Sequence, residues 1–153
     1  MKILFLCVAN SARSQIAEGL AKTYMSDCFE VESAGSEPSG VVNPLAVEAM
    51  KEIGIDLTTH RSKFYNQLSP SFLAGIDYVI SLCAEEVCPA MVHARAAKLK
   101  WPFPDPASVQ GSHEERLQAF REVREQIRER LLTFREELRE QNNTERAKRM
   151  FDS

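Results

Sequence analysis

The sequence lacks a long apolar run, a strong excess of either charge and a cysteine-rich pattern. No apolar stretch approaches the roughly 20 residues that a helix needs to cross a bilayer. The formal net charge is −3, which gives no reason to expect binding to nucleic acid or to a membrane surface. Near the N-terminus one lysine precedes only four apolar residues, and no small-residue cleavage site follows. No signal peptide is therefore expected, and the protein is predicted to be cytoplasmic.

The chain has only four cysteines in 153 residues: Cys7, Cys28, Cys83 and Cys88. In a reducing compartment such cysteines favour catalysis or metal binding over a disulfide framework. The sequence also lacks internal repeats, low-complexity segments and linker-like stretches. With 44% hydrophobic and 27% charged residues, it has the composition of a single globular domain. We place that domain at 1–141, followed by a polar tail at 142–153 that is expected to be frayed or disordered.

The stretch at 7–14, CVANSARS, carries the strongest chemical signal. It follows an apolar run at 3–6 and precedes an apolar-periodic stretch at 16–25. This pattern predicts a strand, a short loop and a helix. In such a loop successive backbone N–H groups can point inward, and with the helix N-terminus they form a cradle for a tetrahedral oxyanion. The predicted binding residues are Val8, Ala9, Asn10, Ser11, Ala12, Arg13 and Ser14.

Cys7 is expected at the base of this cradle. The N–H groups and the Arg13 guanidinium favour thiolate over thiol, so we expect a lowered pKa and a nucleophilic sulfur. Arg13 has the fork geometry to hold two oxygens of phosphate, arsenate or sulfate. Ser14 can donate its hydroxyl to the thiolate, and Asn10 tolerates the left-handed backbone that a tight loop needs. The alternative is a core cysteine, a surface arginine and a helix-capping serine.

Periodicity predicts the remaining elements. Further strands are expected at 29–34, 78–82 and 99–101, and helices at 44–54, near 68–74 and from 113 onward. Asn43 and Pro44 form a helix start. The apolar stripe of the last helix reaches Leu138 and fails beyond Gln141. Strands that alternate with helices predict an α/β fold, with one four-stranded parallel sheet, helices on both faces and a long C-terminal helix.

Three residues that follow strands are expected to gather on one rim of the sheet, because ligands bind at the carboxyl ends of parallel strands. These are Cys7, Cys83 and Asp105. Asp105 lies between Pro104 and Pro106 in a stiff loop, where it is placed to protonate an oxygen that leaves a tetrahedral substrate. The alternative is a loop aspartate whose side chain makes an Asx-turn.

The pair Cys83 and Cys88 has three interpretations. A zinc site would need further ligands, for which only His93 and His113 remain, and the spacing fits common zinc sites poorly. Two buried structural cysteines are the second interpretation. The third is a redox pair, in which Cys83 also reaches Cys7 after a local rearrangement and sequential thiol–disulfide exchange follows.

Together these stretches resemble the thioredoxin-coupled arsenate reductases of the low-molecular-weight tyrosine phosphatase fold. The matching segments are CVANSARS at 7–14, ESAG at 32–35, LC at 82–83 with CP at 88–89, and WPFPDP at 101–106. The resemblance extends over residues 1 to about 135. The phosphate loop and the aspartate loop are shared with the phosphatases, whereas the pair Cys83 and Cys88 is specific to the reductases.

The resemblance implies a mechanism that needs no bound cofactor or metal. Arsenate binds the loop, Cys7 attacks arsenic, Arg13 holds the remaining oxygens and Asp105 protonates the departing hydroxide. Cys83 then attacks Cys7, which releases arsenite and leaves a Cys7–Cys83 disulfide. Cys88 attacks Cys83 in turn, and thioredoxin or a similar thiol reductant reduces the resulting Cys83–Cys88 disulfide. Arsenate and thioredoxin are thus the implied partners.

Two positions depart from the family pattern. Ala12 stands where phosphatases of this fold usually carry a second cysteine, which favours a reductase. Some reductases of the family bind a monovalent cation near residues that match Asn10, Glu18 and Ser33, with a further acidic residue where this chain has Lys63. We hypothesise that the Lys63 ammonium takes the place of the cation and orders Asn10.

Two alternative functions remain. A low-molecular-weight protein tyrosine phosphatase would use Cys7, Arg13 and Asp105 and would not need the later cysteine pair. A non-catalytic oxyanion-responsive or redox-sensing module would act through a partner bound to the long C-terminal helix. Cys28 lies outside all of these motifs and is expected to be structural.

Overall fold

The computed structural model describes residues 1–83 and 95–152, and its centre is one sheet of four parallel strands. The strands are β1 Lys2–Leu6, β2 Glu30–Ala34, β3 Tyr78–Ser81 and β4 Ala97–Lys100. Their order is β2, β1, β3, β4. The chain therefore reverses its direction across the sheet beside β1, at the position where ligands bind in open parallel sheets.

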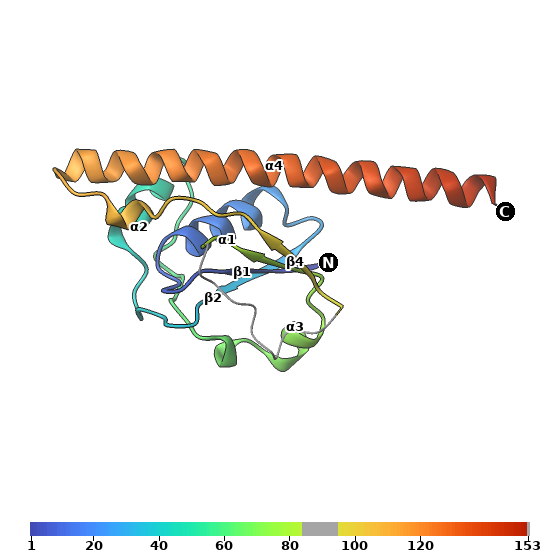
Figure 1. Cartoon of the computed structure of the whole chain (residues 1–153), viewed down its shortest axis with the longest axis horizontal. Coiled ribbons are helices and arrows are strands. Elements are labelled where there is room, and N and C mark those ends of the chain that lie inside the picture. Colours follow the sequence, from blue (N-terminus) through green and yellow to red (C-terminus); the bar gives the residue numbers. More distant parts are fainter. Residues whose placement is uncertain (84–94, 153) are drawn as a thin grey trace.

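Helices cover both faces of this sheet (Figure 1), as the sequence predicts. The helices are α1 Arg13–Tyr24, α2 Pro44–Lys51, α3 Pro70–Ala74 and α4 His113–Phe151, with short 3₁₀ turns η1 Tyr65–Gln67 and η2 Pro106–Ser108. Ile3 and Phe5 of β1 belong to the core beneath α1, α2 and α4, whereas Leu4 and Leu6 belong to the core beneath η1 and α3. Because both faces of β1 are buried, its sequence is a continuous apolar run rather than an alternating one.

The start of α2 is tied to the loop that follows β1. The Asn43 side chain accepts a hydrogen bond of 2.9 Å from the Leu45 N–H, and Pro44 occupies the first turn, which confirms the predicted helix start. The Asn43 N–H donates to the main-chain oxygen of Ser11 at 2.8 Å. The helix therefore holds one side of the loop at 7–13.

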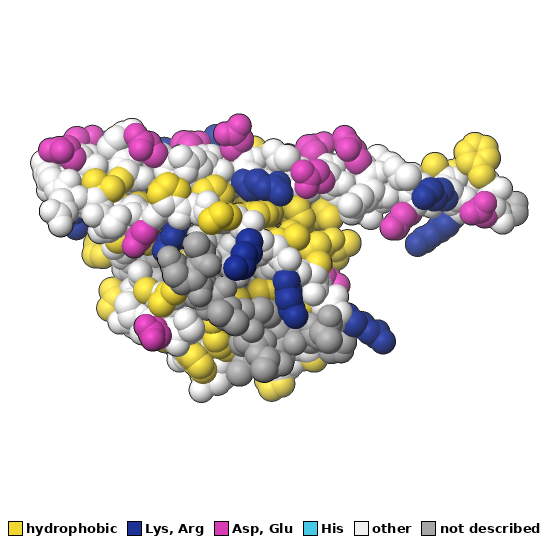
Figure 2. Space-filling model, in the orientation of Figure 1, with side chains coloured by type: hydrophobic (Ala, Val, Ile, Leu, Met, Phe, Trp, Pro, Cys, Tyr) yellow, Lys and Arg dark blue, Asp and Glu magenta, His cyan; other side chains and the backbone are white. Residues whose placement is uncertain are grey.

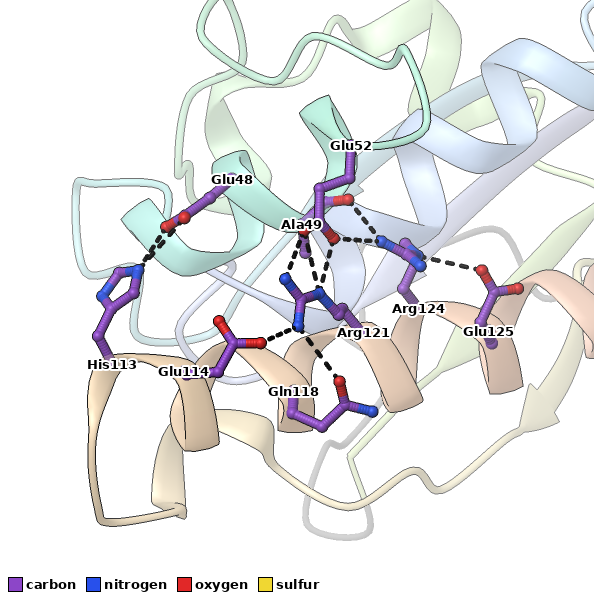
Figure 3. A network of polar contacts seen from close by, with 9 residues as sticks. All are labelled: Glu48, Ala49, Glu52, His113, Glu114, Gln118, Arg121, Arg124 and Glu125. Atoms are coloured by element: carbon purple, nitrogen blue, oxygen red, sulfur yellow. Dashed lines mark hydrogen bonds and ion pairs between the residues drawn. The ribbon is translucent and has the colours of Figure 1, made fainter.

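A network of charged side chains fixes α4 against α2 (Figure 3). Arg121 donates to the Glu52 carboxylate at 2.7 and 2.9 Å. Arg124 donates to Glu52 at 3.0 Å and to the main-chain oxygen of Ala49 at 2.7 Å, which satisfies a carbonyl near the end of α2. The N-terminal end of α2 thus supports the loop at 7–13, and α4 holds the C-terminal end of α2.

The last three turns of α4 extend beyond the residues that pack on the sheet (Figures 1 and 2). The buried stripe ends at Leu138, and every side chain from 139 to 151 is exposed. The sequence predicts a frayed tail from 142, but in the structure these residues continue the helix to Phe151. The reason is local, since 113–151 contains no glycine or proline and Arg139 pairs with Glu136 at 3.0 Å.

Residues 1–83 and 95–152 contain no helix that could span a membrane. Their helices lack the combination of length and apolar character that crossing a bilayer requires.

Candidate active site

The loop between β1 and α1 turns its carbonyl groups outward. Four successive main-chain oxygens, from Val8 to Ser11, accept hydrogen bonds from outside the loop. The donors are the N–H groups of Glu37, Ser39 and Asn43, the Ser62 hydroxyl and the Gln15 amide, at 2.8 to 3.2 Å. Because the C=O and N–H of a planar trans peptide point in opposite directions, the loop N–H groups are directed inward. This is the cradle that the sequence predicts.

Asn10 gives this loop its tight turn. Its φ is 48°, the only positive value of a non-glycine residue in the described part of the chain, which confirms that the left-handed residue is the asparagine. The side chain is fully buried, and its amide donates to the Ser14 hydroxyl at 2.8 Å. Its carbonyl oxygen accepts from the Lys63 N–H at 2.9 Å and from Gln15 at 3.0 Å. These bonds stabilise a conformation that an L-residue otherwise disfavours.

Gln15 and Gly35 support the loop and were not predicted as functional residues. Gln15 is fully buried between α1 and the segment near Arg61, whose main-chain oxygen accepts from it at 2.9 Å. The sequence marks Gln15 only as a polar residue at the start of an apolar-periodic helix. At Gly35 a Cβ atom would lie 2.7 Å from the Cys7 carbonyl oxygen and 3.0 Å from the Asn10 Cβ, so only glycine lets the chain pass this close to the loop.

Cys7 is almost completely buried at the base of the loop, with 3% of its surface exposed. Its Sγ lies 2.8 Å from the Ser14 Oγ. A hydrogen bond from the Cys83 thiol is the largest cause that lowers the pKa of Cys7, from 9.0 to about 6, and the Ser14 hydroxyl and the N–H groups of Ser14 and Asn10 lower it further. Burial opposes this shift. The lowered pKa agrees with expectation, but its main cause is a second cysteine rather than Arg13.

Cys83 follows β3 and is 1% exposed. Its hydrogen bond to Cys7, its burial and the Cys7 charge raise the pKa of Cys83, while the Val8 N–H and Arg13 act in the opposite direction. Of the two thiols, Cys7 is therefore the one that ionises more readily. The sequence predicts that Cys83 reaches Cys7 after a local rearrangement, and in the structure Cys83 is near enough to lower the pKa of Cys7. Cys88 and His93 lie outside the described residues, and Cys28 is exposed between α1 and β2.

Arg13 joins the loop after β1 to the loop after β4. Its Nη1 donates to the main-chain oxygen of Phe103 at 2.9 Å. Two residues further on, the exposed Asp105 accepts a hydrogen bond of 3.0 Å from the Ala107 N–H and begins η2. Its side chain thus makes the Asx-turn that was the alternative to an acid role. The backbone of the Asp105 loop reaches the rim, and the carboxylate is held within its own turn.

Glu18 forms a second polar cluster beside the loop, with 2% of its side chain exposed. His60 Nδ1 lies 2.7 Å from its carboxylate, the Lys63 Nζ lies 3.7 Å away, and the Ser33 hydroxyl donates at 3.3 Å. Burial acts to raise the pKa of Glu18, but the His60 hydrogen bond and the charges of Lys63 and Lys22 outweigh it and hold the pKa below its usual value. Glu18 is therefore an ionised carboxylate.

Potential metal ligands do not cluster in the described part of the chain. Over residues 1–83 and 95–152, no group of three or more His, Cys, Asp and Glu side chains is placed to hold a metal ion.

The fold and the loop define a class of protein. The model of the low molecular weight phosphotyrosine protein phosphatases matches residues 2–144, and the chain belongs to this family. Similar relatives include reductases: the arsenate reductase of Halalkalibacterium halodurans is 46% identical over 136 residues, which cover 88% of this chain and 94% of that protein.

Solved structures give the same picture. An arsenate reductase in the phosphate binding state has a TM-score of 0.72 and 34% identity, and the match covers 87% of this chain and 95% of that one. A thioredoxin-dependent arsenate reductase of Corynebacterium glutamicum has a TM-score of 0.63 and 30% identity, with 88% of this chain and 61% of that chain covered.

Proposed function

We propose that this protein is an arsenate reductase that passes oxidation from Cys7 to Cys83 and Cys88 and is regenerated by thioredoxin. The arsenate reductases among its relatives support the substrate, and the thioredoxin-dependent neighbour supports the reductant. The observation that carries the proposal is a second buried cysteine, Cys83, which follows the strand paired with β1 and acts on the pKa of Cys7. A phosphatase needs only the Cys7 sulfur.

Arsenate would bind in the loop formed by residues 8–14. Of the proposed ligand residues 8–14, the inward N–H groups of Ala9, Asn10, Ser11 and Ala12 supply donors without a cost in side-chain entropy. The guanidinium of Arg13 has five N–H donors, of which one is bonded to Phe103. The others suit two oxygens of a tetrahedral anion. The loop therefore neutralises the anion while leaving its central atom open to Cys7.

In the first step the Cys7 thiolate attacks arsenic and forms an S–As bond. One arsenate oxygen leaves and takes up a proton, for which Asp105 is the proposed donor. For this role the Asp105 carboxylate must turn from the Ala107 N–H toward the substrate, while the Arg13 contact keeps its loop on the rim.

In the second step Cys83 attacks the Cys7 sulfur. The S–As electron pair moves to arsenic, which is reduced by two electrons and released as arsenite, and a Cys7–Cys83 disulfide forms. The hydrogen bond to Cys7 and the Cys7 charge, which raise the pKa of Cys83 in the resting protein, are removed once Cys7 is bonded to arsenic. Burial still raises the pKa of Cys83 at that stage, while the Val8 N–H and Arg13 lower it, so its thiolate forms more readily than in the resting protein.

In the third step Cys88 attacks Cys83 and releases Cys7 as a thiolate. The low pKa of Cys7 makes it a good leaving group. Thioredoxin reduces the Cys83–Cys88 disulfide, and two thiols return for the two electrons delivered to arsenic.

Lys63 has a supporting role in this proposal. Its ammonium lies 3.7 Å from Glu18 and 3.8 Å from Glu32, and its N–H holds the Asn10 side chain. We assign to it the positive charge that a monovalent cation supplies in some members of the family.

A phosphatase remains the second candidate, favoured by the family match and by the link between Arg13 and the Asp105 loop. The deciding experiment measures arsenite production with thioredoxin, thioredoxin reductase and NADPH, and aryl-phosphate hydrolysis in parallel. The proteins are wild type, Cys88→Ser and, as the matched control, Cys28→Ser.

The relay requires that wild type and Cys28→Ser turn over arsenate while Cys88→Ser stops after about one turnover and keeps a slow phosphatase activity. Rapid cleavage of aryl phosphates by all three proteins, with arsenate ignored, would establish the phosphatase.

A further inference from the structure

Ser62 makes a buried bridge between the oxyanion loop and its neighbour. Only 9% of the residue is exposed. Its hydroxyl donates to the main-chain oxygen of Ala9 at 2.9 Å and accepts from the Gly40 N–H at 3.2 Å. Both hydrogen-bonding capacities of the side chain are thus used on backbone groups, one of which belongs to the loop at 7–13.

The oxygen that Ser62 holds belongs to the peptide that carries the Asn10 N–H. That peptide is planar, so fixing the Ala9 C=O outward fixes the Asn10 N–H inward. The Asn10 N–H is one of the backbone donors to the Cys7 sulfur. A second donor to the Ala9 oxygen, the Ser39 N–H at 3.0 Å, acts in the same direction through the backbone.

The backbone strain at Asn10 favours rotation of the Ala9–Asn10 peptide. Asn10 has a φ of 48°, and rotation of the Ala9–Asn10 peptide by half a turn would bring that angle into the favoured negative range. The same rotation would point the Ala9 carbonyl oxygen into the cradle, toward the thiolate and the anion. Hydrogen bonds to the outward-facing Ala9 oxygen oppose this rotation. Of its two donors, the Ser62 hydroxyl and the Ser39 N–H, only the first belongs to a side chain.

We propose that Ser62 is a positioning residue of the oxyanion site, whose hydroxyl holds the Ala9–Asn10 peptide with its N–H directed at Cys7 and at the bound anion. The inference rests on the proposed function only in treating Cys7 as the nucleophile. Its consequences appear in the free enzyme and with inorganic phosphate, without any arsenate chemistry.

The test compares wild type with Ser62→Ala and Ser62→Thr. Ser62→Thr keeps the hydroxyl. Ser39→Ala is the matched control, because its hydroxyl faces Val41 at 2.8 Å while its N–H, which holds the Ala9 oxygen, is retained. The rate of Cys7 carboxamidomethylation is followed against pH, with and without inorganic phosphate. Trypsin cleavage after Lys2 and Arg13 releases Cys7 on a peptide with no other cysteine, so mass spectrometry reads this thiol alone.

In Ser62→Ala the pKa of Cys7 should rise. Its alkylation near and below pH 6 should then slow by about three- to tenfold, the worth of one hydrogen bond, while the rates converge at alkaline pH. Phosphate should protect Cys7 less well by a similar factor. Ser62→Thr and Ser39→Ala should follow the wild-type profile.

A folded Ser62→Ala with the wild-type profile and phosphate protection would overturn the proposal, as would an equal shift in Ser39→Ala. Folding is checked by circular dichroism and urea unfolding. If Ser62→Ala does not fold, Ser62→Cys carries the test, because its thiol is a weaker donor of similar size and should give an intermediate shift. A Ser62→Cys profile identical to wild type would then overturn the proposal. None of these measurements uses arsenate reduction. The outcome for Ser62 can therefore be told apart from a failure of the proposed function.

Discussion

Arg13 donates a hydrogen bond of 2.9 Å to the main-chain oxygen of Phe103. Phe103 in turn donates its N–H to the main-chain oxygen of Leu82 at 3.1 Å, one residue before Cys83. The Arg13 side chain and the Phe103 main chain therefore join the loops that follow β1, β3 and β4 at one rim. The arginine links the loops that carry Cys7 and Asp105, and in the proposed function it also binds the anion.

Arg13→Lys should weaken anion binding strongly. Lysine has a point charge and cannot replace a forked donor, so we expect affinity for phosphate to fall about ten- to a hundredfold, in line with the loss of charge-assisted hydrogen bonds. Protection of Cys7 from alkylation by phosphate measures the affinity. Arg61→Lys, an exposed arginine near the same loop, is the control. Equal protection in Arg13→Lys and wild type would contradict the assignment.

Cys83→Ala should raise the pKa of Cys7 above about 6, because it removes the largest cause of the lowered value. Thiolate reactivity of Cys7 would then be lost at a higher pH than in wild type, whereas Cys83→Ser keeps a donor and should shift less. The pH profile of Cys7 alkylation gives both values, with Cys28→Ala as control. An unshifted profile in Cys83→Ala would show that the contact between the two sulfurs has no electrostatic weight.

Local patterns predicted the frame of this site well. The continuous apolar run at 3–6 identifies the central strand because both of its faces are buried, and Asn43 with Pro44 identifies the start of α2. Asn10 could be named as the left-handed residue because few residue types tolerate that conformation. Each of these signals acts over a few neighbouring residues.

Contacts between distant segments were not predictable in the same way. Ser62 and Lys63 meet the loop across 53 residues, and no periodicity marks a hydroxyl that will face a carbonyl. The influence of Cys83 on Cys7 depends on how closely the ends of β1 and β3 approach, which the pairing register fixes and the sequence alone does not reveal. The apolar stripe does not predict the end of α4, because the stripe stops at Leu138 while helix propensity continues to 151.

Glu18→Gln should lose stability at neutral pH and little in acid. The folded pKa of Glu18 lies below its usual value near 4.5, so its ionisation stabilises the native state above that pH and the contribution disappears as pH falls through the folded pKa. Removing the charge from the cluster with His60 and Lys63 should cost about 3 kcal/mol at pH 7. Urea unfolding at pH 7 and at several values below 4.5 measures the difference, and a difference independent of pH would contradict this reasoning.

Lys63→Asp should make the site responsive to potassium. In wild type the ammonium near Glu18 supplies the positive charge, so phosphate protection and catalytic efficiency should not change with potassium. The variant has an additional carboxylate there and should recover toward wild type as potassium is added, with sodium at equal ionic strength as the control. A large rise in wild-type efficiency with potassium would refute the role of Lys63.

Truncation after Gln141 should leave the domain intact. Residues 142–151 are helical with exposed side chains, and changes at such surface positions alter stability by about 0.5 kcal/mol or less. Urea unfolding and arsenate turnover of the shortened chain should match wild type. A clear loss of stability would mean that the end of α4 packs in solution.

The most direct measurement is disulfide mapping of Cys88→Ser after a single exposure to arsenate without reductant. The relay predicts that one arsenite is released per protein and that Cys7 and Cys83 are recovered as a disulfide, with Cys28 still alkylated as a free thiol. Arsenite release without a Cys7–Cys83 disulfide, or a protein whose cysteines all remain reduced after arsenate, would contradict it.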